Sequence, residues 1–460
     1  MLKRYIGSKE FYKMVMSVAV PIMIQNFITN FVGMLDNIMV GQVGTAQMSG
    51  VSIVNNILFI FYLCIFGATS GAGIFTAQFF GAGNTDGVRH TVRYKNYISL
   101  GIVIVGTALL AIFGSTLIGL FLTGEDTAGE AHLYLSYGES YLAVMLWGML
   151  PFALANVYSS TMRECGETIV PMAAGIAAVV VNLFLNWVLI FGNLGAPEMG
   201  IVGAAAATVI SRFVELAICV VYCHTHSKRF HFVQGLYTSF AIPKELFGKI
   251  TLKSLPLLAN EALWSVGITT LSLCYSFKGL SVVPAINISN TITNTMQVSL
   301  LAMGNAVGII IGQRLGAGRP ADEVVDYVRK LLAFSVSFTL IFSVLQIIIS
   351  GFFPEVYNTT EDVKALAAKF IVVAAVSLPA RAFTNASYFT LRAGGKTLVT
   401  FLFDSCFVWA VLVPLAFCLC SFTPLSIVII YAVVEGMEFV KCILGYYMLR
   451  GRKWINRIVV

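Results

Sequence analysis

An aspartate stands inside an apolar stretch near the amino terminus, in the segment MLDNIMVG at residues 34–41. The stretch begins at Met14 and is long enough to cross a membrane, so Asp36 is an ionisable group within a span. Counting 1.5 Å per residue places it in the second half of that helix. Two interpretations remain open: a helix-end aspartate, or one part of an ion site.

Polar residues at a similar depth follow on two later apolar stretches. Asn182 and Asn186, in NLFLNW, lie one helical turn apart on one face, and Thr208 reaches a similar level on the next stretch. One carboxylate, two amide oxygens and one hydroxyl are hard oxygen ligands suited to Na⁺, or to a proton site controlled by burial. We therefore predict a cation-coupling site for H⁺ or Na⁺ at Asp36, Asn182, Asn186 and Thr208.

The second half of the chain has acids of its own. Glu261, in PLLANEALW, and Asp404, in LFDSCF, each lie about eight residues inside an apolar stretch, so they share a depth. A charged side chain at a helix centre costs roughly 3 kcal/mol, and retaining it indicates a water-lined interior or partner charges. We predict a second cation or substrate site at Glu261 and Asp404. The alternative is a salt-bridge cluster with Arg381, Glu438 and Lys441.

These residues must be positioned by membrane helices. The 460 residues are 58% hydrophobic and 11% charged, whereas a soluble domain carries about 25% charged residues. The composition therefore predicts an all-α polytopic membrane protein with twelve spans of roughly 20 residues or more. The expected spans are 14–40, 49–75, 94–118, 132–160, 168–191, 200–223, 253–275, 284–311, 328–352, 365–391, 397–420 and 424–449.

The orientation follows from the basic residues in the short connections. They gather on one side, which also holds both ends of the chain, so we expect an integral protein of the plasma (inner) membrane with both termini cytoplasmic. This bias also accounts for the net charge of +7 without a nucleic-acid partner. The basic side includes Lys3, Arg4, Lys9, Lys13, Arg89, Arg93, Lys95, Arg163, Lys228, Arg229, Arg314, Arg319, Arg392 and Lys396. The opposite connections carry Glu125, Asp126, Glu198, Glu355, Glu361 and Asp362.

The chain repeats itself internally. TAQFFGAG at 76–83 corresponds to IGQRLGAG at 311–318, and the same offset of 235 residues places Pro21 on Pro256. Six spans per half, both starting on the same side, predict two six-helix lobes related by a parallel repeat. We expect an amino-terminal lobe at 1–223, a cytoplasmic linker at 224–252 and a carboxy-terminal lobe at 253–460. Each GAG turn would let two helices approach closely.

Several of these segments together resemble the multidrug and toxic compound extrusion (MATE) family. They are the first span with its proline and LDNIMVG, the paired AQFFGAG and GQRLGAG turns, and the tail RGRKWINR. The resemblance covers the whole chain and implies a twelve-helix antiporter that expels amphipathic, often cationic, organic compounds or drugs in exchange for Na⁺ or H⁺. It also implies that the first-helix aspartate and the fifth-helix polar residues form an amino-lobe coupling site.

The sequence departs from that family pattern at two points. Asn186 stands where some relatives have a second acid, which weakens the case for Na⁺ relative to the proton. Members with a glutamate on the seventh helix use it for cation coupling or substrate binding, and some also carry an acid on the tenth helix. No acid occurs between Lys369 and Arg392 here, so Asp404 would take that place.

Other classes of protein fit less well. No HExxH or GxSxG motif occurs, and GGKT at 394–397 is no P-loop because Thr390 stands at the first glycine position, so we expect no enzyme and no ATP-driven pump. A lipid-linked precursor flippase of the same architecture remains the alternative. We expect no cofactor beyond the coupling ion, and a monomer in the bilayer. Nine scattered cysteines are interpreted as small buried residues, with only a weak zinc possibility at Cys219 and Cys223.

Overall fold

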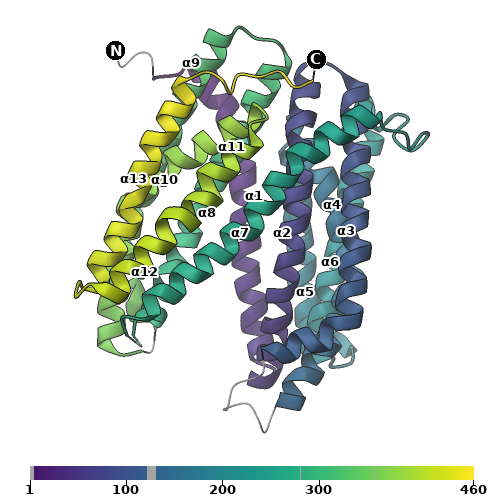
Figure 1. The fold of residues 1–460 in the computed structure, drawn as a ribbon. Helices are drawn as coiled ribbons and strands as arrows, with labels where there is room; N and C mark the ends of the chain where they lie inside the picture. The colour runs from purple at the N-terminus through teal and green to yellow at the C-terminus, as the bar shows by residue number, and fades with distance from the viewer. Residues whose placement is uncertain (1–4, 122–130, 280, 358, 460) are drawn as a thin grey trace. The chain divides into compact units, whose positions relative to one another are not determined.

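The computed structural model describes residues 5–121, 131–279, 281–357 and 359–459, and these ranges contain helices and no strand (Figure 1). Lys3, Arg4, Glu125 and Asp126, which entered the orientation argument, lie outside the described residues. The first half consists of α1 (Lys9–Gly41), α2 (Thr45–Gly81), α3 (Thr85–Leu120), α4 (Ala131–Glu164), α5 (Ile169–Phe191) and α6 (Gly200–Thr225).

The second half repeats this order of long helices. It consists of α7 (Lys244–Ser276), α8 (Val282–Gly316), α9 (Ala321–Ile349), α10 (Glu361–Ala393), a composite span and α13 (Ile427–Arg450). The composite span joins α11 (Thr397–Phe401) to α12 (Val413–Phe422) through two π-helical segments, Leu402–Cys406 and Val408–Leu412. Short 3₁₀ turns lie at Asn193–Gly195, His231–Val233 and Phe353–Val356.

Within the described ranges, eleven helices are long and apolar enough to cross a membrane, with the composite span taken as one. The remaining long helix, α13, carries Glu435, Glu438 and Lys441 in its middle. Each expected span falls on one of these helices, so the predicted twelve-helix, all-α architecture is confirmed. The helices extend further than the apolar stretches because polar flanks continue them. For example, α3 begins at Thr85, where the Asn84 side chain accepts a hydrogen bond from the Gly87 amide at 2.8 Å.

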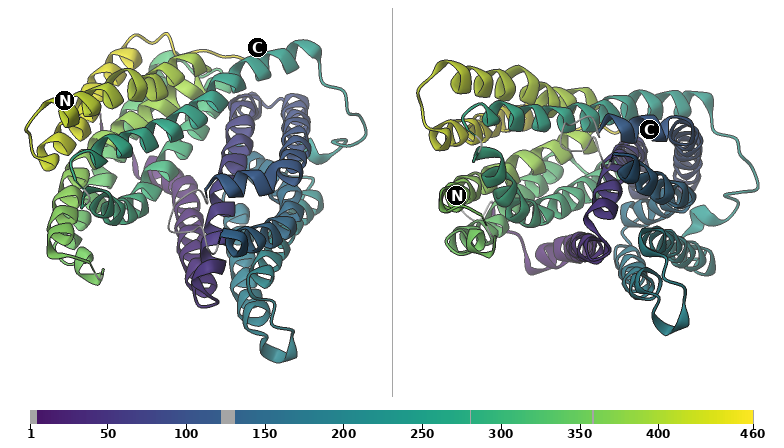
Figure 2. Two further views of the ribbon diagram at one scale, coloured as in Figure 1. Left: turned by 60° about the horizontal axis from the view of Figure 1, so that its bottom comes forward. Right: turned by 90° about the horizontal axis from the view of Figure 1, so that it is seen from below.

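The helices pack into two compact units. The amino-terminal unit comprises Ile24–Thr76 and Asn84–Ser254. The carboxy-terminal unit comprises the described residues of Met1–Met23, Ala77–Gly83 and Leu255–Val460, and its yellow and green helices lie side by side in both views of Figure 2. These units are groups of packed residues, whereas the lobes at 1–223 and 253–460 are divisions of the sequence and stay a prediction.

Each unit has its own apolar core. In the amino-terminal unit, Val54 and Leu58 of α2 pack with residues of α3, α4 and α6. In the carboxy-terminal unit, Val15 and Ala19 of α1 pack against α8 and α9. Because lipid is as apolar as the outer side chains of these helices, the helices are held together by the packing of side chains in these cores.

The two GAG turns contact each other backbone to backbone within the carboxy-terminal unit. A Cβ atom at Gly81 would collide with the carbonyl oxygen of Gln313, and one at Gly316 would collide with that of Gln78. Gln78 and Gln313, like Gly81 and Gly316, are 235 residues apart. The close approach predicted for these turns is therefore present, and it is reciprocal between the repeats.

The segment between the two halves is docked on the amino-terminal unit. The guanidinium of Arg93, on α3, donates to the carbonyl oxygens of Gly235, Leu236 and Ala241 at 2.7, 2.9 and 3.1 Å. The Tyr97 hydroxyl donates to the Phe240 carbonyl at 2.6 Å. Because backbone carbonyls of the segment are held by α3 side chains, this connection is a packed part of the unit.

Candidate cation site and buried ionic clusters

The four residues predicted for the coupling site lie together in the amino-terminal unit. Asp36 comes from α1, Asn182 and Asn186 from α5, and Thr208 from α6, which packs against α5. The Asn186 amide donates to Asp36 Oδ1 at 2.6 Å, and Asn182 lies 3.3 Å from the Thr208 hydroxyl. Both asparagines are buried, so their polar groups depend on one another and on Asp36.

The amide of Asn182 is satisfied in one orientation. With Nδ2 toward Asp36 it donates to the two carboxylate oxygens at 2.9 and 3.1 Å, and its Oδ1 accepts from the Thr208 hydroxyl at 3.3 Å. The amides of Asn182 and Asn186 therefore both donate to Asp36, an arrangement that suits an ionised carboxylate.

One acceptor of this site has no partner. Asn186 is 1% exposed, and its Oδ1 has no hydrogen-bond donor among the described residues. A buried carbonyl oxygen that is left unpaired costs about 1–3 kcal/mol. A water molecule or a cation bound at this oxygen would remove that cost.

In the carboxy-terminal unit the structure brings Glu261 and Asp404 into one cluster, but it gives Asp404 partners of its own. Lys441 Nζ donates to Asp404 Oδ1 at 2.8 Å, and Asn260 Nδ2 donates to Oδ2 at 3.1 Å. Glu261, the neighbour of Asn260, is half-buried and interacts electrostatically with Asp404 and Arg392. Asp404 thus forms a salt bridge with Lys441, as the alternative interpretation expects. Glu261 forms no salt bridge within the described residues.

The π-helical turns of the eleventh span position Asp404. Ser405 donates its hydroxyl to the Asn260 carbonyl at 2.8 Å and to Asn260 Oδ1 at 2.7 Å. Trp409 Nε1 donates to the Leu263 carbonyl at 2.9 Å. These bonds attach the π-helical segments to α7, and such segments occur often at functional sites. Sequence reasoning missed Asn260, and its position beside Glu261 is the signal that could have found it.

A second set of buried charges lies along α10 and α13. The Arg381 guanidinium pairs with both carboxylate oxygens of Glu435, at 2.6 Å to Oε1, and Ser377 donates to Oε2 of the same residue at 2.8 Å. The Thr384 hydroxyl donates to Glu438 at 3.0 Å. Glu435, Glu438 and Lys441 are three residues apart and share a face of α13, so helical spacing could have grouped them.

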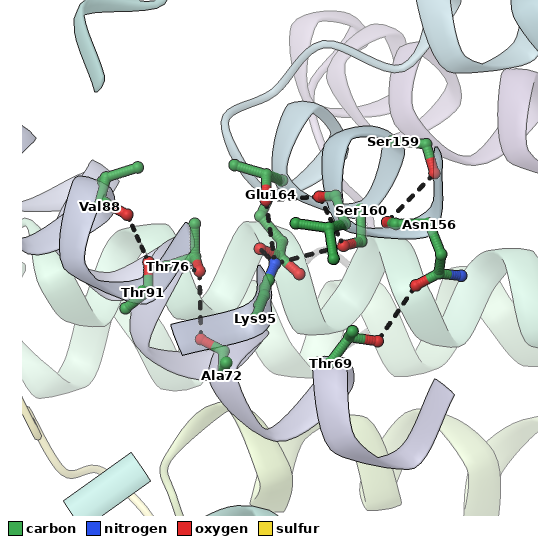
Figure 3. Close-up of polar contacts among 12 residues, drawn as sticks. Thr69, Ala72, Thr76, Val88, Thr91, Lys95, Asn156, Ser159, Ser160 and Glu164 are labelled. Atoms are coloured by element: carbon green, nitrogen blue, oxygen red, sulfur yellow. Dashed lines mark hydrogen bonds and ion pairs between the residues drawn. The ribbon is translucent and has the colours of Figure 1, made fainter. Parts of the chain in front are cut away.

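The ion pair between Lys95 and Glu164 was not found from the sequence (Figure 3). Lys95 counted there as a charge in a connection, but it lies inside α3 and is fully buried. Its ammonium donates to Glu164 Oε2 at 2.5 Å, to Thr161 at 3.2 Å and to Ser160 at 3.3 Å. All three N–H donors are thereby used, which is the condition for burying an ammonium group.

The surroundings of this pair are polar and tightly packed. Thr76 donates to Thr91 at 2.9 Å, and Thr69 donates to Asn156 at 3.1 Å, as Figure 3 shows for the second of these bonds. A Cβ atom at Gly73 would collide with the Glu164 carboxylate, so the glycine leaves the space that the carboxylate occupies. Among the described residues, no group of three or more histidine, cysteine or acidic side chains could hold a metal ion, and Cys219 and Cys223 are free thiols.

Twelve long helices in two repeated halves, with buried carboxylates in both compact units, define a polytopic membrane protein of the transporter class. The family model MatE matches the chain twice, over residues 21–188 and 256–431. The matches begin at Pro21 and Pro256, the residues that the internal repeat pairs. The chain belongs to the MatE family, whose members are transporters and not enzymes.

Relatives of known name cover the whole chain. The probable multidrug resistance protein NorM of Thermotoga maritima is 26% identical over 472 aligned positions, covering 100% of this chain and 97% of that protein. The multidrug resistance protein PmpM of Pseudomonas aeruginosa is 24% identical and covers 88% of this chain and 83% of its own length.

Solved structures show the same fold. The MATE transporter VcmN of Vibrio cholerae, in its bent form, has a TM-score of 0.83 at 19% identity, covering 97% of this chain and 99% of that one. An outward-facing multidrug resistance MATE family transporter has a TM-score of 0.83 at 19% identity and covers 98% and 97%. At these identities the likeness is one of fold alone.

Proposed function

We propose that this protein exports amphipathic, often cationic, organic compounds in exchange for H⁺ or Na⁺ by alternating access. The multidrug names of its relatives support the substrate class. The observation that carries the coupling role is the Asp36 site. There, a carboxylate inside a membrane-spanning helix accepts hydrogen bonds from two buried asparagine amides, and the strength of these bonds depends on its negative charge.

In the proposed cycle a cation from outside binds at Asp36 and removes the charge that the two asparagine amides otherwise hold. The loss of these charge-assisted bonds changes how α1 is held by α5, because Asp36 is the α1 residue to which the two α5 asparagines donate. One charge that moves across 100 mV supplies about 2.3 kcal/mol, which corresponds to a concentration ratio of about fiftyfold. Glu261, with Asp404 as a companion, would bind a second cation or the substrate.

The remaining features of this proposal concern the protein in its membrane. We place it as a monomer in the plasma (inner) membrane with both termini in the cytoplasm, because the basic connections fall on the side of the termini. Its expected partners are the lipid bilayer and small organic cations or drugs.

The test is efflux of a fluorescent organic cation from proteoliposomes under separately imposed Na⁺ and pH gradients. Wild type is compared with Asp36→Asn and Glu261→Gln, and Asp326→Asn is the control because that acid pairs with Lys330 on α9. We expect one gradient to drive efflux and Asp36→Asn to reduce it about tenfold or more.

Full gradient-driven efflux in Asp36→Asn would make Asp36 a helix-end residue and would move the coupling role to Glu261. No cation efflux under either gradient would reject the antiporter and favour the lipid-linked precursor flippase. That alternative is tested by translocation of a polyprenyl-linked pyrophosphate across the same proteoliposomes.

A further inference from the structure

The polar face of α6 continues beyond the cation site. Arg212 lies one helical turn after Thr208, and Glu215 follows three residues later on the same face. Arg212 Nη1 donates to Glu215 Oε2 at 3.1 Å, the pair that their spacing predicts. A cationic group therefore lies one helical turn from Thr208, the residue that contacts Asn182 in the cation site.

Arg212 is only partly used by this pair. Its Nε is buried and has no acceptor within the part of the chain that the structure describes. The guanidinium lies over the ring of Phe152, 5.1 Å from its centroid. A guanidinium has five N–H donors in a fixed fork. Arg212 therefore keeps one N–H donor that Glu215 does not use. Asp36 is the other carboxylate of this part of the unit that could accept from it.

Asp36 and Arg212 interact electrostatically. Their electrostatic interaction is reciprocal, and Arg212 is the basic residue that interacts with Asp36. Among the described residues, Tyr62 of α2, Tyr141 of α4 and Glu215 are further titratable side chains that interact with Asp36 or with Arg212. The tyrosines are phenols and Glu215 is an acid, so the positive charge that balances Asp36 comes from Arg212.

A row of alternating charges extends this balance through the unit. Arg163 interacts electrostatically with Glu215 and Glu164, and Glu164 pairs with Lys95. The acids of the row are Asp36, Glu215 and Glu164, and the bases are Arg212, Arg163 and Lys95. The row is neutral only when Asp36 is ionised. Each cation that binds Asp36 leaves one excess positive charge, which is expensive in a membrane interior.

We propose that Arg212 is the internal counter-cation of Asp36 and competes with the coupling ion for it. In the empty site its guanidinium stabilises the ionised carboxylate. When a cation binds Asp36, Glu215 alone neutralises Arg212. The Arg212–Glu215 pair therefore sets the affinity of Asp36 for the cation. This makes Arg212 a positioning residue that tunes the affinity for the coupling ion, and it rests on the cation role proposed for Asp36.

The test measures the concentration of the driving cation, Na⁺ or H⁺, that gives half-maximal efflux of the fluorescent organic cation from proteoliposomes. Three variants separate charge from structure: Arg212→Gln with Glu215→Gln, Glu215→Gln alone, and Arg212→Lys. The control is Lys330→Gln with Asp326→Asn, which removes an ion pair from α9, away from both proposed sites. Gel filtration checks that each variant is folded.

The two glutamine variants should shift in opposite directions. In the variant without Arg212 and Glu215, no guanidinium competes with the coupling ion for the Asp36 carboxylate. The half-saturating concentration of that ion should therefore fall about tenfold, equivalent to about 1.4 kcal/mol. With Glu215→Gln alone, Arg212 turns more fully to Asp36 and the concentration should rise about threefold. Arg212→Lys keeps the charge and should stay near wild type, as should the control pair.

Unchanged half-saturation in both glutamine variants, or a shift of the same sign in both, would overturn the proposal and leave Arg212–Glu215 as a structural pair. Arg212→Lys also decides: a shift there as large as that of the double variant would show that shape, not charge, matters. The Asp36→Asn result keeps the two levels apart. If that variant still couples, the role of Asp36 fails; if it does not and half-saturation is unmoved, only the counter-cation fails.

Discussion

The two compact units handle buried charge differently. In the amino-terminal unit, the row formed by Asp36, Arg212, Glu215, Arg163, Glu164 and Lys95 has equal numbers of acids and bases, and its Lys95–Glu164 pair is buried, with Lys95 0% exposed and Glu164 12% exposed. In the carboxy-terminal unit the side chain of Asp404 is 23% exposed beside Lys441. That cluster has one acid in excess: its acids are Glu261, Asp404, Glu435 and Glu438, and its bases are Arg381, Arg392 and Lys441.

This difference shows that the repeat conserves helices and not charges. The repeat position of Glu261 is occupied by Asn26, and that of Asp36 is occupied by the buried Leu271. The glycines of the two turns, in contrast, remain equivalent. Close packing of the backbone at the two turns requires a glycine in both halves of the repeat. A buried acid, in contrast, is present at one of the two equivalent positions in each case. We therefore expect charge substitutions to have different effects in the two units, and substitutions of the two equivalent glycines, Gly81 and Gly316, to have equal effects.

The largest effect on stability should come from Lys95→Met. The substitution removes the ammonium group from the buried carboxylate of Glu164, which costs about 3 kcal/mol when one partner of a buried pair is lost. Thermal unfolding in detergent, followed by circular dichroism, measures the loss. Adding Glu164→Gln to the variant should recover most of it. Wild-type stability of Lys95→Met alone would show that water reaches the pair, and the contrast between the units would then disappear.

Gly81→Ala and Gly316→Ala should each destabilise the carboxy-terminal unit by about 2 kcal/mol. An added Cβ meets a backbone carbonyl in both cases, and backbone cannot rotate away as a side chain can. Gly351→Ala is the matched control, because nothing lies within 4 Å of its Cβ position. The same unfolding experiment applies. Effects that differ between Gly81 and Gly316 by more than a factor of two would argue against the reciprocal contact.

A smaller effect is expected for Lys441→Met, about 1.5 kcal/mol. Asp404 loses its ammonium partner but keeps the amide of Asn260, and its partial exposure lets water solvate the carboxylate. The ratio of this loss to that of Lys95→Met measures how much more open the second cluster is. An equal loss in the two variants would mean that both clusters are sealed.

The smallest effect on stability should be that of Glu261→Gln, within about 0.5 kcal/mol of wild type. Glu261 has no ion pair in the described structure, and its cluster already has an acid in excess, so removing one negative charge relieves repulsion from Asp404. Efflux of the organic cation should fall in the same variant if Glu261 binds cation or substrate. Marked destabilisation with unchanged efflux would assign Glu261 a structural role.

Much of the architecture could be predicted from the sequence, because hydrophobic stretches of bilayer length have few alternatives to a membrane helix. The α1, α5 and α6 positions of Asp36, Asn182, Asn186 and Thr208 followed from counting residues along antiparallel helices, and the structure brings these side chains together. Lys95, although it falls inside the expected span 94–118, was counted only among the basic residues of one side, because its partner Glu164 lies on another helix. The π-helical turns around Asp404 could not be predicted from the sequence either, since they accompany hydrogen bonds from Ser405 and Trp409 to α7.

By itself, the sequence determined the twelve helices and the internal repeat, since these depend on hydrophobicity and on the fixed rise of a helix. Only the tertiary structure decided the partners. It pairs Lys95 with Glu164 and Asp404 with Lys441, and it brings the Arg212–Glu215 pair within electrostatic range of Asp36. The physical reason is that a helical period shows which residues share a face, whereas the neighbour of that face depends on how all the helices pack.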